Sequence, residues 1–215
     1  MVYLPPAFAE TRSEVLIEHI ERHDFGLLVS HGAGDSSGGG LIASQIPFLV
    51  ERRGGQLVLR GHLARANPQV ADLDGGGEAL AIFAGPHAYI SPSWYAAGPA
   101  VPTWNYASVH AYGAACAIGD PEWLLGLLHR LSERHEAREP VPWRMRDLPD
   151  SYLGSMLNDI VGIEIAVTRL EGKFKLSQNR PAADRPRIIA ALDRREDAGS
   201  RDVARLMRQR EPAAE

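Results

Sequence analysis

The stretch GPHAYISPSWYAAGPAVPTWNYASVHAYG, residues 85–113, decides how this chain is interpreted. It holds two of the four tryptophans and four of the six tyrosines of the chain. Glycine and proline interrupt it, and Ser, Thr, Asn and His stand between the rings, whereas ordinary core strands are rich in Val, Ile and Leu. Rings that carry OH and NH groups suit a flat, partly polar ligand, and they equally suit a sheet face that closes a core or an interface. The composition leaves both interpretations open.

The second half of this stretch predicts a long strand over residues 103–118. Side chains alternate between the two faces of a strand, so the residues divide into two sets. One set is small and fits the filled interior of a narrow barrel: Asn105, Ala107, Val109 and Ala111. The other set is large and amphipathic, and we expect it to face a helix, a ligand or another subunit: Trp104, Tyr106, Ser108, His110 and Tyr112.

The surrounding sequence predicts five more strands and four helices. Apolar runs and alternation favour strands at residues 25–31, 41–51, 56–62, 78–85 and 160–171. Helical patterns favour helices at residues 11–23, 121–138, 188–195 and 201–208. There is no alternating strand–helix rhythm, and the glycine-rich loop at 31–40 lacks the Gly-Lys-Ser/Thr of a phosphate-binding loop. The pattern predicts a mainly β fold, a small antiparallel barrel with helical additions.

Composition limits the possible functions. The chain has 215 residues, a formal net charge of −4 and one cysteine. A negative charge argues against strong nonspecific binding to nucleic acid, although it leaves room for a local basic patch. No apolar run is long enough for a membrane span and no secretory signal is visible, so we expect a cytoplasmic protein. The eight histidines offer no metal-ligand spacing, so no metal site is predicted.

Two polar groups invite a binding role. Arg60 and His62 share one face at the end of a predicted strand, and Arg65 and Asn67 follow directly. Cations and an amide at a strand-to-helix turn can bind phosphate, although a surface salt-bridge cluster has the same composition. The segment GKFKLSQNR, residues 172–180, places three cations after a core strand. It is either a solvated charged segment or a segment that packs against another surface through Phe174 and Leu176, which stand between the charged residues.

Several motifs together resemble a known family. In chain order they are VYLPPAF, GHLARANPQ, GPHAYISPSWY, VPTWNYASVHAYG, DPEW, IVGIEI and GKFKLSQNRP. These motifs, within residues 2–207, resemble those of the PaiB-like family of FMN-binding negative transcriptional regulators. That family belongs with the FMN-binding split barrels. It is related to pyridoxamine-phosphate-oxidase-like flavoproteins. The resemblance implies a six-stranded antiparallel split barrel over residues 1–180, with a helical extension at 181–215. It also implies a homodimer with FMN at the subunit interface.

The resemblance suggests which residues hold the flavin. The phosphate and ribityl end is assigned to Arg60, His62, Arg65 and Asn67. The residues expected around the isoalloxazine ring or at the dimer interface are Tyr89, Ser91, Trp94, Trp104 and Tyr106. The site is completed, from the same chain or its partner, by Lys175, Ser177, Gln178 and Arg180. Relatives often have His where Gln45 stands and Gln where Ala84 stands, which puts any role of those positions in doubt here.

Three functions remain open at this point. The first is the flavin-binding repressor that the resemblance implies, with DNA as a weakly supported partner because no helix-turn-helix is legible. The second is an FMN-dependent oxidoreductase of a small substrate, in which the flavin supplies the chemistry and no catalytic motif is needed. The third is a split-barrel dimer that has lost its flavin.

Overall fold

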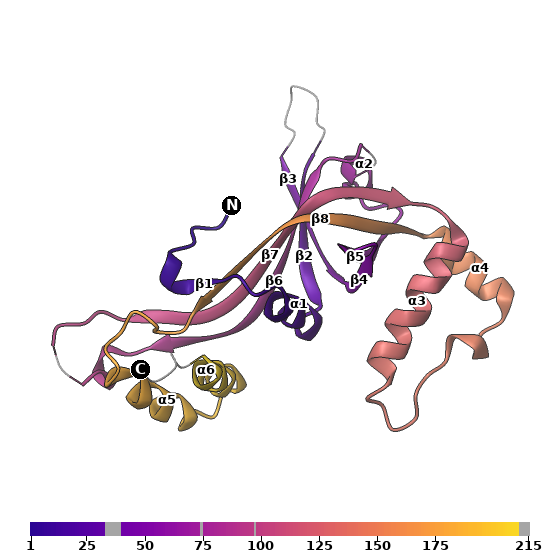
Figure 1. The fold of residues 1–215 in the computed structure, drawn as a ribbon. Helices are drawn as coiled ribbons and strands as arrows, with labels where there is room; N and C mark the ends of the chain where they lie inside the picture. The colour runs from indigo at the N-terminus through magenta and orange to yellow at the C-terminus, as the bar shows by residue number, and fades with distance from the viewer. Residues whose placement is uncertain (33–39, 74, 97, 211–215) are drawn as a thin grey trace. The chain divides into compact units, whose positions relative to one another are not determined.

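The computed structural model describes residues 1–32, 40–73, 75–96 and 98–210, and within them it contains one eight-stranded sheet (Figure 1). The strands are β1 (Ala9–Glu10), β2 (Phe25–His31), β3 (Leu41–Pro47), β4 (Leu49–Arg53), β5 (Gln56–Ala64), β6 (Glu78–Ile90), β7 (Thr103–Ile118) and β8 (Ile160–Lys175). Their order is β3-β2-β6-β7-β8-β5-β4, and β1 pairs with β8. The pairs with a defined register, including β2–β3, β4–β5 and β5–β8, are antiparallel.

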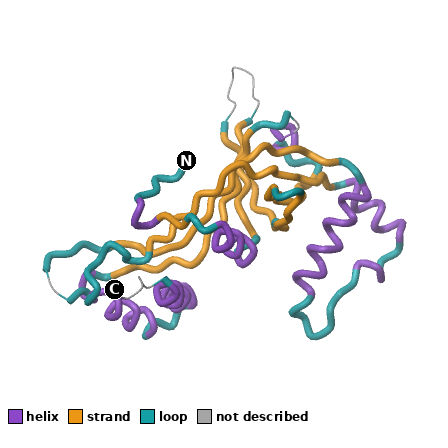
Figure 2. The backbone as a smooth tube through the Cα atoms, viewed as in Figure 1, coloured by secondary structure: helices purple, strands orange, loops and turns teal. Residues whose placement is uncertain are grey.

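Six α-helices and three short 3-10 helices accompany the sheet in the described residues (Figure 2). The α-helices are α1 (Ser13–Arg22), α2 (Gln69–Leu73), α3 (Pro121–Glu136), α4 (Asp150–Asn158), α5 (Asp184–Asp193) and α6 (Ala198–Gln209). The 3-10 helices are η1 (Pro6–Phe8), η2 (Pro92–Trp94) and η3 (Met145–Asp147). None of the helices in these residues is long and apolar enough to cross a membrane.

The prediction of a mainly antiparallel β fold with flanking helices is confirmed, but the expected number of six strands is wrong. The predicted strand at 41–51 is two strands, because Phe48 leaves the ladder, is only 1% exposed and packs edge-on against Phe83. The two-residue strand β1 adds the eighth. β6 also runs five residues further than predicted, so the aromatic stretch begins inside a strand. Most of the glycine-rich loop at 31–40 lies outside the described residues.

The division of the β7 side chains into two faces is confirmed. Each member of the small set is at most 1% exposed: Asn105, Ala107, Val109 and Ala111. On the other face Trp104 is 52% exposed, as expected for a side chain left for another contact. Tyr112 departs from this pattern because it is buried, with the guanidinium of Arg169 lying 3.6 Å from its ring centroid.

Two compact units divide the chain, and β6, β7 and β8 contribute residues to both. The first unit comprises Met1–His19, Ala84–Val109 and the chain from Glu171 onward. The second comprises Ile20–Phe83 and His110–Leu170. The first unit includes α5 and α6, which lie side by side in Figures 1 and 2. The predicted domain boundary at residue 180 stays a prediction.

In the first unit, a buried arginine ties the C-terminal helices to the end of β8. Arg185 is 4% exposed and donates hydrogen bonds to the carbonyl oxygens of Leu176 (2.7 Å) and Met207 (3.0 Å). A buried guanidinium needs such acceptors, since an unsatisfied charge in the interior is costly. This anchor fixes the segment that follows β8, where the sequence places several candidate residues.

In the second unit, α3 packs against β4 and β8 through apolar contacts. The helix begins as predicted, since the Asp120 side chain accepts a hydrogen bond from the Glu122 amide at 2.8 Å. Leu127 and Leu131 form a buried cluster with Leu49 of β4, and Trp123 packs on this cluster. A Cβ at position 162 would collide with the Trp123 ring, so glycine is required there for the helix to approach the strand.

Candidate functional site

Aromatic side chains of the first unit gather around the exposed Trp104. Its ring centroid lies 5.9 Å from that of His87 and 6.0 Å from that of Tyr89. Nearby in sequence, Ser91 caps η2 by accepting a hydrogen bond from the Ser93 amide, and the Trp94 carbonyl accepts one from Arg187 at 3.1 Å. The end of β6 and the start of β7 therefore present planar rings with polar edges.

Three cations of the first unit lie among these rings. Lys175 donates to the Trp104 carbonyl at 2.8 Å and also to the hydroxyl of Thr103. Lys173, which is 9% exposed, lies 5.7 Å from the Tyr106 ring centroid. The Arg180 guanidinium lies 4.3 Å from the Tyr95 ring centroid. We call these six residues the cation–aromatic cluster: Tyr95, Trp104, Tyr106, Lys173, Lys175 and Arg180.

The charge of the cation–aromatic cluster is not balanced by acids. Among the residues that the structure describes, no carboxylate forms an ion pair with Lys173, Lys175 or Arg180. Burial, and then the positive charges of Lys173 and Arg180, lower the pKa of Lys175. Like charges that are held together without a counter-charge favour the binding of an anion.

The turn after β8 holds the cations of this cluster in place. Ser177 has a φ of 61° and is buried, and it exchanges hydrogen bonds with the Asn105 amide at 2.9 and 3.2 Å. Gln178 accepts from the Leu176 amide at 2.6 Å and donates to the Phe174 carbonyl. A non-glycine residue in the left-handed region is strained, and the surrounding contacts must hold it there. Both predicted binding residues of this turn are thus occupied with contacts inside the chain.

Tyr95 carries an unused polar atom. Its side chain is 7% exposed, and its hydroxyl has no hydrogen-bond partner among the described residues. The following residue is fixed, because the Ala96 amide donates to the Asp184 carboxylate at 2.7 Å. A buried hydroxyl without a partner is costly, and a ligand oxygen or nitrogen would satisfy it.

The second unit contains Arg60, which is surrounded by acids. Its guanidinium makes ion pairs with Glu51 and Glu164, each at 2.9 Å, and it lies 5.1 Å from the Trp123 ring centroid. Glu164 also takes two hydrogen bonds from Arg53, at 2.8 and 2.9 Å, while Arg130 of α3 pairs with Glu51. We call this group the Arg60 network: Glu51, Arg53, Arg60, Arg130 and Glu164. Each of its three arginines is paired with at least one of its two carboxylates, and it links α3 to three strands.

The other predicted phosphate residues of the second unit are also largely engaged. Arg65 donates to the carbonyl oxygens of Asn158 (2.6 Å) and Ile160 (2.9 Å). Asn67 accepts from the Gln69 amide at 2.9 Å at the start of α2 and donates to Ser44 at 2.9 Å. His62 differs from these two, because its Nδ1 atom is buried without a partner in the described part of the chain. Burial lowers the pKa of His62, which favours the neutral ring.

The predicted flavin residues therefore fall in both units, four in the second and nine in the first. Their assignment to the flavin stays a prediction. Two members of the cation–aromatic cluster, Tyr95 and Lys173, were missed. Lys173 stands two residues before Lys175 on the same strand, so strand alternation alone could have placed both on one face. The burial of Tyr95 had no such signal. In the described residues there is no group of three His, Cys, Asp or Glu side chains that could hold a metal ion.

Comparison with solved structures defines the class of this fold. A FAD- and heme-binding protein from Mycobacterium smegmatis is 18% identical and superposes with a TM-score of 0.57 over 78% of this chain and 73% of that one. The flavocytochrome Anf3 from Azotobacter vinelandii is 12% identical, with a TM-score of 0.56 over 78% and 69% of the two chains. At these identities the likeness concerns the fold alone, and it confirms the split-barrel architecture.

Comparison of sequences identifies the family. The family described as "Putative FMN-binding domain" matches residues 2–169. The protease synthase and sporulation protein PAI 2 of Bacillus subtilis is 34% identical over 206 residues, which cover 96% of each chain. The uncharacterized protein AN0679 of Emericella nidulans is 32% identical over 97% of each chain. The chain belongs to this FMN-binding, PaiB-like family, and the prediction of FMN as its cofactor is confirmed at the level of the family.

Proposed function

We propose that this protein is an FMN-binding negative transcriptional regulator that holds its flavin at a homodimer interface. The observation that carries the flavin part is the cation–aromatic cluster, which combines planar rings with positive charge that no described carboxylate balances. A planar ring system with a phosphate tail matches both features. The regulatory part is supported by the full-length similarity to a Bacillus subtilis protein named for protease synthesis and sporulation.

The two groups of cations are not equally suited to the phosphate. In the Arg60 network two carboxylates already lie against the Arg60 guanidinium, so a phosphate there would meet repulsion. In the cation–aromatic cluster a phosphate would meet Lys175 and Arg180 without competing acids. We therefore propose Lys175 and Arg180 as its principal partners. The assignment of His62, Arg65 and Asn67 to the phosphate and ribityl end stays a prediction of the family resemblance.

The rings would hold the other end of the cofactor. When bound, FMN supplies a redox-active ring system, and the protein supplies its position and surroundings. Trp104 and Tyr106 would contact its planar surface, with Tyr89, Ser91 and Trp94 at its edges. The unused hydroxyl of Tyr95 would donate a hydrogen bond to the bound molecule.

The flavin part is tested by titrating the flavin-free protein with FMN and following flavin fluorescence. We expect saturable binding, and we expect the double variant Lys175→Met, Arg180→Met to bind at least about a hundredfold more weakly, since each lost contact to phosphate is charge-assisted. Arg201→Met is the matched control, because Arg201 is an exposed cation of the same unit outside the cluster. Equal binding by the double variant would exclude the proposed phosphate site. No binding by the wild type would exclude the flavin function.

The dimer and DNA parts have separate tests. Light scattering of the flavin-loaded protein should give twice the monomer mass of 23.5 kDa. A monomer that retains FMN would rule out an interfacial flavin. DNA fragments from the source genome are first selected by binding to the immobilised protein. The protein should then slow the migration of these fragments in a gel, with competitor DNA present and across a range of salt concentrations. The absence of any shift at low salt would refute direct repression.

A further inference from the structure

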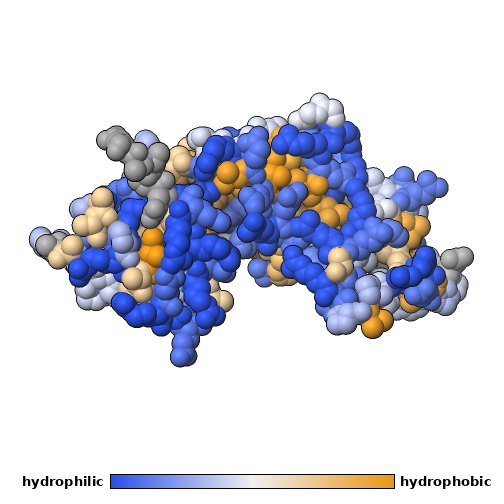
Figure 3. All heavy atoms as spheres, turned by 60° about the horizontal axis from the view of Figure 1, so that its bottom comes forward, coloured by the Kyte–Doolittle hydropathy of each residue, from blue (hydrophilic) through white to orange (hydrophobic). Residues whose placement is uncertain are grey.

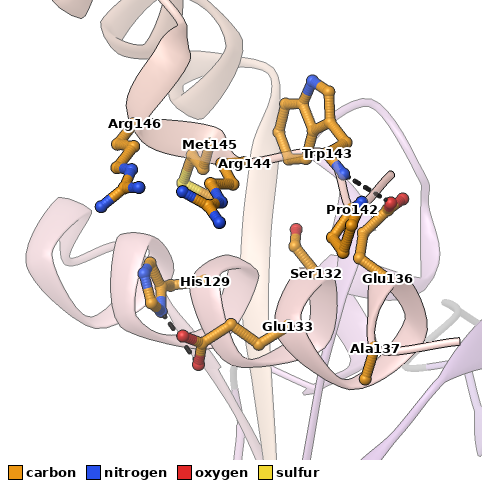
Figure 4. A pocket seen from close by; sticks show the side chains of 10 residues that line it. All are labelled: His129, Ser132, Glu133, Glu136, Ala137, Pro142, Trp143, Arg144, Met145 and Arg146. Atoms are coloured by element: carbon orange, nitrogen blue, oxygen red, sulfur yellow. Dashed lines mark hydrogen bonds and ion pairs between the residues drawn. The ribbon is translucent and has the colours of Figure 1, made fainter. Parts of the chain in front are cut away.

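A pocket of about 420 Å³ lies in the second unit, and none of the residues that line it is assigned to the flavin (Figure 4). One wall is a face of α3, and the other is the segment at residues 142–146 that follows the helix. The α3 residues of this wall share one face because they recur at helical spacing, and the C-cap Ala137 follows them: His129, Ser132, Glu133 and Glu136. The opposite wall consists of Pro142, Trp143, Arg144, Met145 and Arg146.

The two walls carry opposite charges. Glu133 stands on the α3 wall, whereas Arg144 and Arg146 extend from the opposite wall toward the helix (Figure 4). The side chains of Arg144 and Arg146 form no ion pair or hydrogen bond with any other described residue. Glu136 has a structural contact, because its carboxylate accepts a hydrogen bond from the Trp143 amide at 2.8 Å and thereby fixes the segment to the helix.

The acid on the α3 wall remains available to a ligand. Within the described part of the chain, the Glu133 carboxylate forms an ion pair with His129 alone, at 3.3 Å, and both side chains are more than half exposed. Such a surface pair contributes little to stability, and the second oxygen of the Glu133 carboxylate can accept a further hydrogen bond. The pocket thus offers two guanidinium groups on one side and one carboxylate acceptor on the other.

Apolar surface lines the same pocket. Trp143 is 46% exposed, although an indole ring usually finds an apolar partner. Met145 and Pro142 extend the apolar surface on its wall, and Ala137 does so on the helix. A volume of about 420 Å³ lies within the usual range for small-molecule sites.

We propose that this pocket binds a free α-amino acid with an aromatic side chain. Its carboxylate would bind Arg144 and Arg146, and its ammonium group would donate to Glu133. Its ring would lie against Trp143 and Met145, where aromatic and sulfur contacts add to the burial of apolar surface. An anion alone would leave Glu133 as a repulsive neighbour, and a cation alone would face two arginines. The pocket therefore favours a zwitterion over either singly charged analogue.

The test is calorimetric titration of the protein, as purified, with L-phenylalanine, 3-phenylpropionate and 2-phenylethylamine. The second compound lacks the ammonium group and the third lacks the carboxylate. We expect L-phenylalanine to bind at least about tenfold more tightly than either analogue. The double variant Arg144→Ala, Arg146→Ala should lose at least about tenfold in affinity for L-phenylalanine. Arg138→Ala is the control, because Arg138 is an exposed cation of the same unit that does not line the pocket.

A second variant separates the two charged contacts. Glu133→Gln should weaken L-phenylalanine and remove its advantage over 3-phenylpropionate, while circular dichroism shows an unchanged fold. The proposal is overturned if L-phenylalanine gives no saturable heat with the folded wild type. It is also overturned if the two analogues bind as well as the amino acid, or if the arginine double variant binds as the wild type does.

Discussion

Two groups of cations in this molecule differ in what surrounds them. In the Arg60 network the guanidinium of Arg60 lies between Glu51 and Glu164, and the group joins α3 to the strands. In the cation–aromatic cluster Lys175 donates hydrogen bonds to the Trp104 carbonyl and the Thr103 hydroxyl and forms no ion pair with a described carboxylate. Removing one partner of a paired charge destabilises the fold, whereas a cation without a counter-charge attracts an anion. The comparison shows that the groups around a cation, more than its residue type, indicate whether it stabilises the fold or binds a ligand.

Charged side chains elsewhere on the described surface are hydrated or paired. On the face drawn in Figure 3, hydrophilic residues cover most of the surface, as expected for charged side chains that remain hydrated. Among the arginines of the C-terminal helices, Arg205 and Arg208 pair with Asp202 and Asp193. These exposed pairs contribute little to stability and also reduce the charge available to DNA.

The strongest test of the contrast is the loss of an acid from the Arg60 network. Burial raises the pKa of Glu164, but hydrogen bonds from Arg53 and Arg60 lower it by more, so the carboxylate is ionised in the fold. Glu164→Gln leaves Arg60, whose side chain is 14% exposed, with one acid instead of two. We expect the free energy of unfolding to fall by about 2 kcal/mol, less than for a fully buried pair because water still reaches the site.

Urea denaturation of the two proteins measures this change. Glu139→Gln is the matched control, since Glu139 is an exposed acid of the same unit without a described ion pair. A loss no larger than in the control would mean that the network does not stabilise the fold. Its cations would then be as available to phosphate as those of the cluster.

The opposite result is expected for the cation–aromatic cluster. Lys175→Met removes a charge whose ionised neighbours are positive, so the free energy of unfolding should change by less than about 0.5 kcal/mol. The same variant should bind FMN about tenfold more weakly, because one charge-assisted contact is lost. Arg60→Met should show the reverse pattern, with a clear loss of stability and little change in affinity. Denaturation and FMN titration of both variants measure the effect of each substitution on stability and on affinity. Equal effects of Lys175→Met and Arg60→Met on both quantities would contradict the proposed difference between the two groups.

Much of this contrast could not be predicted from the sequence. The strand 103–118 and its two faces follow from alternation, and α3 from its cap and apolar stripe, because these signals are local. The sequence predicts Arg60 as a phosphate ligand because it shares a face with His62 at the end of a predicted strand. Glu164, which lies opposite Arg60 in the β5–β8 register, is 104 residues away in the chain. Pairing register is a long-range property, and a single sequence does not contain it. The motif resemblance identified the family and the cofactor, but not which cations remain unpaired.

A smaller effect should appear in the pH dependence of FMN affinity. Burial and the charges of Lys173 and Arg180 lower the pKa of Lys175, and a bound phosphate would raise it again. Affinity should therefore be full while Lys175 is protonated and should fall as the pH rises through its lowered pKa. Measurements above pH 7 keep the phosphate a dianion, since its second pKa is about 6. Lys175→Arg should flatten the profile, because guanidinium stays charged throughout this range. An unchanged slope in that variant would assign the titration to another group.

The smallest expected effect concerns an acid of the first unit that is paired with cations. Burial raises the pKa of Glu10, but hydrogen bonds from Arg12 and the charge of Arg210 lower it to about 2. A carboxyl whose pKa is depressed by folding stabilises the native state above its unfolded pKa of about 4.3, and this contribution is lost as the pH falls toward about 2. Glu10→Gln should be less stable than the wild type at pH 7 and should lose less stability over that acid range. If thermal unfolding shows the same acid dependence in both proteins, other carboxylates with a lowered pKa, such as Asp197 and Glu164, govern acid unfolding instead.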